Sequence, residues 1–151
     1  MLKLKDRSAF GARAAFALSV AAAFAAGYAL SAARAAGIHF EPLVSAGETI
    51  LGEAFVYPPG KPKITTGILS LEPGAETGWH THGVPLTGII LDGELTVDYG
   101  DKGKRTYRKG ASLIETMATA HNGKNTGESA MRLFVVFAGA EGIANTMPVK
   151  K

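Results

Sequence analysis

The sequence predicts an all-β domain, a sandwich or small barrel of short strands. From Ile38 onward, short apolar or alternating runs are separated by clusters of glycine, proline, aspartate and asparagine. Helical periodicity is hard to find in this region. Turn-forming stretches such as YPPGKP, EPGAE and YGDKGK punctuate the chain at regular intervals. This regular punctuation is typical of a domain built from many short strands.

Ten strands are predicted from these runs. In chain order they cover residues 38–44, 49–57, 63–72, 78–82, 86–91, 94–100, 104–109, 111–116, 120–125 and 131–139. The closing stretch NTMPVKK is predicted to be a frayed end. The chain has no cysteine, so the domain has to be stable without disulfides, and residues 36–151 are numerous enough for one hydrophobic core.

The first 35 residues are predicted to be a secretory signal peptide. A basic start precedes an uncharged, alanine-rich stretch at 14–33, and the small residues Ala33 and Ala35 mark a cleavage site. The same stretch is long enough to span a bilayer, so an uncleaved anchor is the alternative. We therefore expect a leader at 1–35, a barrel at 36–151, and a periplasmic or secreted protein, or one held in the membrane by residues 14–33.

The charge of the chain is concentrated in this leader. The whole sequence has 16 lysines and arginines against 13 acidic residues, and the first 35 residues contain five of the basic and one of the acidic ones. The remainder carries 11 basic and 12 acidic residues. A domain close to neutral lacks the basic face that nucleic-acid binding requires. We expect no nucleic-acid partner, and no stable membrane contact unless the leader is retained.

Three histidines are placed as metal ligands would be. His80 and His82 alternate within a predicted strand and therefore point to the same face. His121 begins a second predicted strand. Neutral imidazole is a common ligand for divalent metals. The fourth histidine, His39, has no partner pattern and is predicted to be structural.

The spacing around the first pair resembles the first sequence block of the cupin superfamily, which reads Gly, five residues, His-x-His, three or four residues, Glu, six residues, Gly. Here Gly74 is followed by five residues, His80, His82, and then Leu86 and Gly93 at the next two positions of the frame. Leu86 stands where the family has its glutamate.

A second block of the same superfamily is present in altered form. It reads Gly, five residues, Pro-x-Gly, two residues, His, three residues, Asn. Gly110, His121 and Asn125 occupy their places, whereas Thr116 and Ala118 replace the proline and glycine of the turn. The two blocks and the hairpin between them cover residues 74–125. The resemblance implies a single double-stranded β-helix (jelly-roll) barrel, and by family habit a homodimer.

The resemblance also implies a metal site with an unusual ligand set. Three histidines suffice for one divalent transition metal such as Fe, Mn, Zn or Ni, and nitrogen ligands alone do not choose among these. Glu115 or Glu76 can replace the missing carboxylate only if the strand alternation continues through the nearby turn, so that its side chain points to the same face as the histidines. We expect the pocket around the metal to be lined by Leu86, Ile90, Asn125 and Glu115, and Trp79 to alternate outward. The sequence offers no evident second acid–base group.

Three functions fit these features. The first is a metal-dependent enzyme, a dioxygenase or isomerase acting on a small molecule. The second is a non-catalytic cupin of the cell envelope that binds a metal or a small ligand. The third is a structural barrel in which the histidines only fill the core.

Overall fold

The computed structural model describes residues 37–150 and is all-β. Within that range the only helix is one turn of 3₁₀ helix, η1 (Gly100–Lys102). The chain divides into two compact units after Glu41, and every strand belongs to the second unit, from Pro42 onward. The predicted leader and its boundary at residue 35 lie outside the described residues. No helix between residues 37 and 150 is long and apolar enough to cross a membrane.

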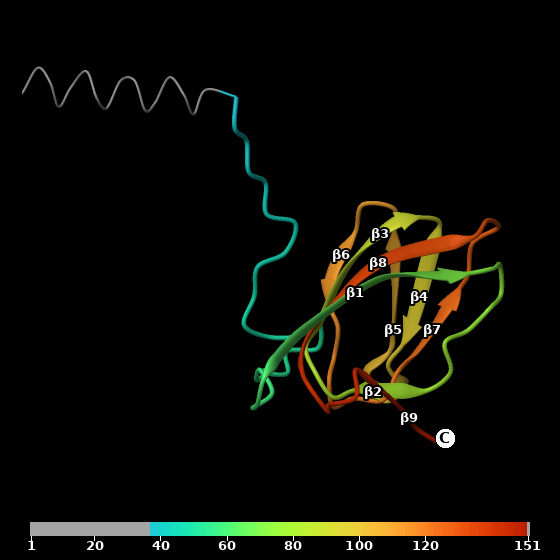
Figure 1. Ribbon diagram of the computed structural model, residues 1–151. Coiled ribbons are helices and arrows are strands. Elements are labelled where there is room, and N and C mark those ends of the chain that lie inside the picture. The colour runs from blue at the N-terminus through green and yellow to red at the C-terminus, as the bar shows by residue number, and fades with distance from the viewer. Residues whose placement is uncertain (1–36, 151) are drawn as a thin grey trace, which may run out of the picture. The chain divides into compact units, whose positions relative to one another are not determined.

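Within the described part of the chain, nine strands form three antiparallel sheets. They are β1 (Pro62–Leu71), β2 (His80–His82), β3 (Leu86–Asp92), β4 (Glu94–Asp98), β5 (Lys104–Arg108), β6 (Ser112–Ile114), β7 (Asn122–Asn125), β8 (Met131–Ala140) and β9 (Thr146–Pro148). The sheet orders are β1-β8-β3-β6, β5-β4-β7 and β2-β9. The two larger sheets form the walls of a barrel, and β2 and β9 lie at one end of it (Figure 1). The predicted all-β jelly-roll class is confirmed.

The core lies between the two larger sheets and follows from the alternation in each strand. On β4, for example, Leu95 and Val97 are buried while their neighbours are only half-buried. On β8, Met131, Leu133 and Val135 follow the same rule. Burying each such side chain contributes about 1.5–3 kcal/mol. The register of the sheets is therefore fixed, because a shift by one residue would expose the whole set.

The two predicted strands before residue 58 are wrong. Residues 38–44 and 49–57 contain only an isolated bridge between Glu48 and Ala54. Their apolar side chains are largely exposed, with Phe40 at 84% and Val56 at 76%. Apolar runs of this kind become strands only where a neighbouring strand pairs with their backbone continuously. The Ile50 N–H donates to the carbonyl oxygen of Ile114 at 2.8 Å, but no described strand pairs with either run.

The predicted frayed end is also wrong. β9 pairs with β2 in register, with Thr146 opposite His82 and Pro148 opposite His80. A proline is compatible with pairing at the edge of a sheet or at the end of a strand. The last strand therefore pairs with the strand that carries two of the candidate ligands. No local pattern in NTMPVKK indicates this pairing.

Gly93, in the turn between β3 and β4, is expected to be irreplaceable. Its φ is +73°, and a Cβ atom there would lie 2.8 Å from the Cα atom of Met131. We expect Gly93→Ala to lower the free energy of unfolding by about 3 kcal/mol or more, because backbone on both sides would have to move. Urea denaturation measures the change. Gly103→Ala is the matched control, since its φ is +86° with nothing within 4 Å of the added Cβ, and an equal loss in both variants would contradict the steric argument.

Candidate metal centre and its cavity

Three histidines converge at one end of the barrel. β2 carries His80 and His82, and His121 immediately precedes β7. The backbones of His80 and His121 exchange two N–H···O hydrogen bonds of 3.0 Å, so these two residues are held directly opposite each other. The ring centroids are 4.3 Å apart for that pair, 5.0 Å for His80 and His82, and 5.1 Å for His82 and His121. A ligand nitrogen from each ring lies within 4.8 Å of the other two.

Backbone carbonyls fix the orientation of all three rings. The Nδ1 atom of His80 lies 2.8 Å from the carbonyl oxygen of Gly78, that of His82 lies 3.1 Å from Asn145, and that of His121 lies 3.0 Å from Thr119. A carbonyl oxygen can only accept, so each Nδ1 carries the hydrogen and donates it. The lone pair of each ring is then on Nε2, which is the arrangement that metal-binding histidines adopt.

The rings are also held in their neutral form. Burial lowers the pKa of each histidine, and for His82 the pKa falls to about 4. For His82 the second cause is the neighbouring His121. At neutral pH a metal therefore does not compete with protons for these nitrogens. Among the described residues, the donor set fits one divalent transition metal.

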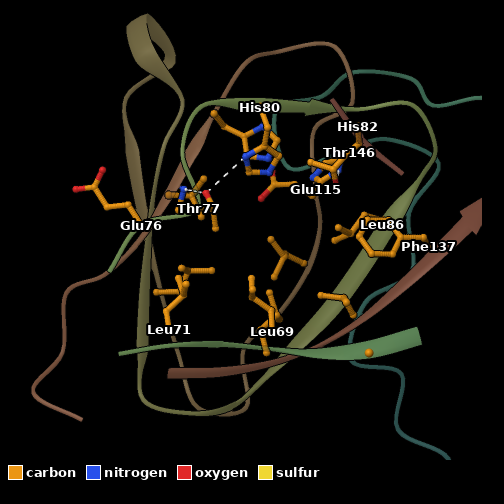
Figure 2. Close-up of a pocket in the computed structure, with 18 of the residues that line it drawn as sticks. Leu69, Leu71, Glu76, Thr77, His80, His82, Leu86, Glu115, Phe137 and Thr146 are labelled. Carbon is orange, nitrogen blue, oxygen red and sulfur yellow. Dashed lines mark hydrogen bonds between the residues drawn. The ribbon is translucent and has the colours of Figure 1, made fainter. Parts of the chain in front are cut away.

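An apolar cavity of about 580 Å³ adjoins the histidines. The residues that line it come from both larger sheets, and Leu69, Leu71, Leu86 and Phe137 form an apolar wall (Figure 2). The Phe137 ring lies 5.8 Å from the ring of His82. Trp79, which we expected to point outward, is half-buried and lines the same cavity. A volume of this size accommodates a small organic molecule.

Two of the four predicted lining residues lie elsewhere. Leu86 and Glu115 line the cavity, but Ile90 and Asn125 do not. Ile90 belongs to the packed core and is 1% exposed. The Asn125 amide donates to the carbonyl oxygens of Leu71 and Ser129, both at 2.8 Å. Its role is to fix the turn after β7, because a fully buried amide has to be hydrogen-bonded.

The carboxylate alternatives separate clearly. Glu76 also lines the cavity, but it is exposed, accepts hydrogen bonds from Asn122 and Lys124, and does not belong to the histidine group. His39 is also exposed and lies 4.0 Å from Glu41. Glu115 is 5% exposed and lies in the cavity wall. Of the acidic residues weighed from the sequence, Glu115 is the one the fold places beside the histidines.

A residue that sequence reasoning missed holds the loop before His121. Glu53 accepts hydrogen bonds from the Thr116 hydroxyl (2.5 Å), the Met117 and Ala118 backbone N–H groups (3.2 and 3.3 Å) and the Thr119 hydroxyl. Burial raises the pKa of Glu53, but these hydrogen bonds outweigh it and the pKa is lowered. The turn that has lost its proline and glycine is thus held by a carboxylate more than 60 residues away in sequence, a distance at which no local motif gives a signal.

Glu53→Ala is expected to weaken metal binding without touching a ligand. The loop that Glu53 holds includes Thr119, whose carbonyl oxygen orients His121. Losing such a supporting contact lowers metal affinity about 10- to 100-fold, and isothermal titration with Zn²⁺ measures it. Glu48→Ala, an exposed residue of the same segment, is the control. Equal affinities in the two variants would show that the loop holds its shape unaided.

Comparison with known proteins gives a family and a set of distant structures. Residues 67–137 match the model of the cupin domain. The structure is similar to oxalate decarboxylase from Bacillus subtilis (22% identity, TM-score 0.47, covering 57% of this chain and 23% of that one). It is also similar to oxalate decarboxylase from Lactobacillus farciminis in a formate complex (19%, 0.48, 57% and 26%). A sugar phosphate isomerase from Silicibacter pomeroyi is a third (20%, 0.43, 50% and 50%).

The chain spans about a quarter of the oxalate decarboxylase chains. No curated protein sequence matches the chain at a significant level.

Proposed function

Residues 67–137 form a cupin domain, and we propose that this domain is a metal-dependent enzyme, of the dioxygenase or isomerase kind, acting on a small molecule. The observation that carries the proposal is the convergence of three oriented, neutral imidazoles at one end of an apolar cavity. His80, His82 and His121 would hold one divalent ion. Fe, Mn, Zn and Ni all suit three nitrogen ligands.

The three histidine ligands determine the electrostatics of the proposed site. Three neutral histidines leave the full charge of a divalent ion uncompensated, and such an ion supplies Lewis acidity when bound. The wall formed by Leu86 and Phe137 keeps the surroundings apolar, which strengthens attraction between opposite charges. A small substrate that is largely apolar and carries an anionic oxygen fits both features.

A non-catalytic binding protein is the second candidate. The mostly apolar lining of the cavity favours it, because holding a small ligand requires few polar groups. The predicted leader also suits a metal- or ligand-binding protein of the cell envelope. Replacement of both His80 and His121 with no loss of bound metal would instead favour a barrel in which the histidines only fill the core.

Elemental analysis of the protein purified from its own host compartment tests the metal. One equivalent of a transition metal per chain supports the proposal, and a metal-free protein that also fails to take up Fe, Mn, Zn or Ni contradicts it. The metal-loaded protein is then tested for oxygen uptake and for turnover in a metabolite screen. Turnover in the wild type that disappears in the His80/His121 double variant supports the enzyme, whereas ligand retention without turnover supports the binding protein.

We also propose that the mature protein is a periplasmic or secreted homodimer. β1 is the outer strand of its sheet and carries Ile64 and Ile68, which are 64% and 45% exposed. An open edge strand with apolar side chains favours pairing with a second chain. We expect Ile64→Lys to convert the dimer to a monomer in light scattering. Thr106→Lys, which adds the same charge on β5, is the control. If both variants remain dimeric, β1 is not part of the dimer interface.

A further inference from the structure

Glu115 follows β6 and stands directly opposite Leu86 across the β3–β6 ladder. Its backbone N–H donates to the carbonyl oxygen of Leu86 at 2.9 Å, one step beyond the pair formed by Thr87 and Ile114. Directly opposed residues of an antiparallel pair share a face, with Cβ atoms about 4.5–5.5 Å apart. A carboxyl group therefore stands next to the position from which the first sequence block lacks one, but it comes from the neighbouring strand.

The carboxyl group of Glu115 faces the cavity without belonging to the histidine group. Glu115 lines the cavity and lies on the same side as His80 and His82 (Figure 2). Among residues 37–150, the group of potential ligands within 4.8 Å of one another consists of the three histidines alone. The position is thus close enough to meet a molecule bound at the histidines, and it is separate from the ligands themselves.

Two contacts hold the carboxyl group in this wall. One oxygen of Glu115 accepts from the backbone N–H of Thr116 at 2.8 Å, and the other accepts from the Tyr99 hydroxyl at 3.3 Å. The Tyr99 hydroxyl is in turn 3.0 Å from that of Tyr107. A carboxylate has about four acceptor positions, so these contacts leave capacity for a ligand in the cavity.

The surroundings of Glu115 suit proton exchange near neutral pH. Burial raises the pKa of its carboxyl group to about 7, although the Thr116 N–H, the Tyr99 hydroxyl and the nearby His80 all oppose the rise. The charge of Glu53 adds to it. An acid with this pKa is present in both forms and can either give or take a proton.

We propose that Glu115 is the acid–base residue of the cavity and exchanges a proton with a hydroxyl group of the ligand bound at the three histidines. In the forward direction the O–H bond of the ligand breaks, the proton moves to a carboxylate oxygen of Glu115, and the electron pair remains on the ligand oxygen. The ligand class is a small enol, phenol or hydroxy compound. The inference rests on the proposed function, because the hydroxyl group has to be held at the metal position.

The test uses full-length protein loaded with Zn²⁺ and the dye 4-nitrocatechol. The visible absorption of this small diol distinguishes its singly and doubly deprotonated forms, and Zn²⁺ adds no colour or redox chemistry. We expect wild-type protein at pH 7 to bind the doubly deprotonated dye. In Glu115→Gln only bulk water is left to take the second proton, so the bound dye should lose this proton at a higher pH than in the wild type and should keep it in larger part at pH 7. Zn²⁺ affinity should fall by less than 100-fold, because Glu115 lies near the proposed ion position without being one of its ligands.

Leu69→Asn is the matched control in the same wall. It introduces an amide but keeps the Glu115 carboxyl group and its hydrogen bonds to Tyr99 and Thr116, so the bound dye should remain doubly deprotonated. The same spectral change in both variants would mean a general disturbance of the wall and would overturn the inference. An unchanged dye spectrum in Glu115→Gln, or a metal-loaded wild type that does not bind the dye, would overturn it too.

Metal affinity separates the remaining outcomes. A 100-fold or greater loss of Zn²⁺ affinity in Glu115→Gln would make Glu115 a ligand instead. If the wild type itself binds no metal, the proposed function fails. If the wild type binds metal and Glu115→Gln changes neither affinity nor dye, the proposed function stands and only the acid–base role is lost.

Discussion

His121→Ala should abolish the stabilisation of this protein by divalent metals. A ligand that binds only the folded chain stabilises it by about 2.7 kcal/mol when its free concentration is 100 times its Kd. Removing one of three ligands leaves two nitrogens for the metal. Because losing even a supporting contact lowers metal affinity about 10- to 100-fold, we expect His121→Ala to lower it more than 100-fold. Thermal unfolding with and without Zn²⁺ measures this as the disappearance of the metal-induced rise in Tm.

The fourth histidine provides the control for this result. His39 is exposed, and its nearest ionic partner is Glu41 at 4.0 Å, so His39→Ala makes the same chemical change away from the candidate ligands. It should keep the full metal-induced rise in Tm. Retention of that rise in His121→Ala as well would leave the histidines with a structural role only.

The pH range of metal binding follows from the same environment. Burial lowers the pKa values of His80, His82 and His121, so protons compete with the metal for these nitrogens only below the usual histidine pKa of about 6.5. Glu115, whose pKa is about 7, loses its negative charge between pH 7.5 and pH 6, so the His121→Ala effect is best measured at pH 7.5, and wild-type affinity should fall moderately at pH 6.

The histidine group could be foreseen from the sequence because its cause is local. The alternation in a strand puts His80 and His82 on one face, whatever the rest of the chain does. The resemblance to the second cupin block, carried by Gly110, His121 and Asn125, then implies that His121 joins them. The structure brings these three residues together at the expected face.

What escaped prediction depends on contacts that are distant in sequence. Glu53 reaches the loop before His121 from the segment that precedes β1, and β9 is a strand only because β2 lies beside it. Glu115 was uncertain because the turn at Thr116 obscured its parity. The hydrogen bond to Leu86 decides it, and no single segment contains that information.

Glu115→Gln should make the metal-free protein more stable at high pH than the wild type, by a margin that grows with pH. The folded pKa of Glu115 is raised from 4.5 to about 7. The folded state therefore holds the proton more tightly, and the resulting stability is present in full below pH 4.5 and lost as the pH rises through 7. The shift in pKa corresponds to about 3 kcal/mol of unfolding free energy, which the wild type loses between pH 4.5 and pH 7. Glutamine is neutral at every pH, so Glu115→Gln does not lose this stability.

The comparison between variant and wild type isolates this one group. The histidines also titrate as the pH falls. The charge of Glu115 raises the pKa of His80, so the contributions of the histidines cancel in the difference of unfolding free energies only at the upper end of the pH range, where the rings are neutral in both proteins. Urea denaturation between pH 4.5 and pH 8 in the presence of a chelator measures the difference. Glu141→Gln makes the same chemical change at an exposed carboxylate paired with Lys61 and is the control for the substitution itself. A flat line for Glu115→Gln would mean that the carboxyl group is not buried as described.

Bound metal should reduce the extra stability that Glu115→Gln has over the wild type at high pH. A divalent ion at the three histidines would lie near the carboxyl group and favour its charged form, because an opposite charge lowers the pKa of an acid. The margin of Glu115→Gln at pH 8 should therefore shrink when Zn²⁺ is added. A margin that is the same with and without metal would place the ion too far from Glu115 for the two to act on one ligand, so a stability measurement tests the proximity on which the acid–base role depends.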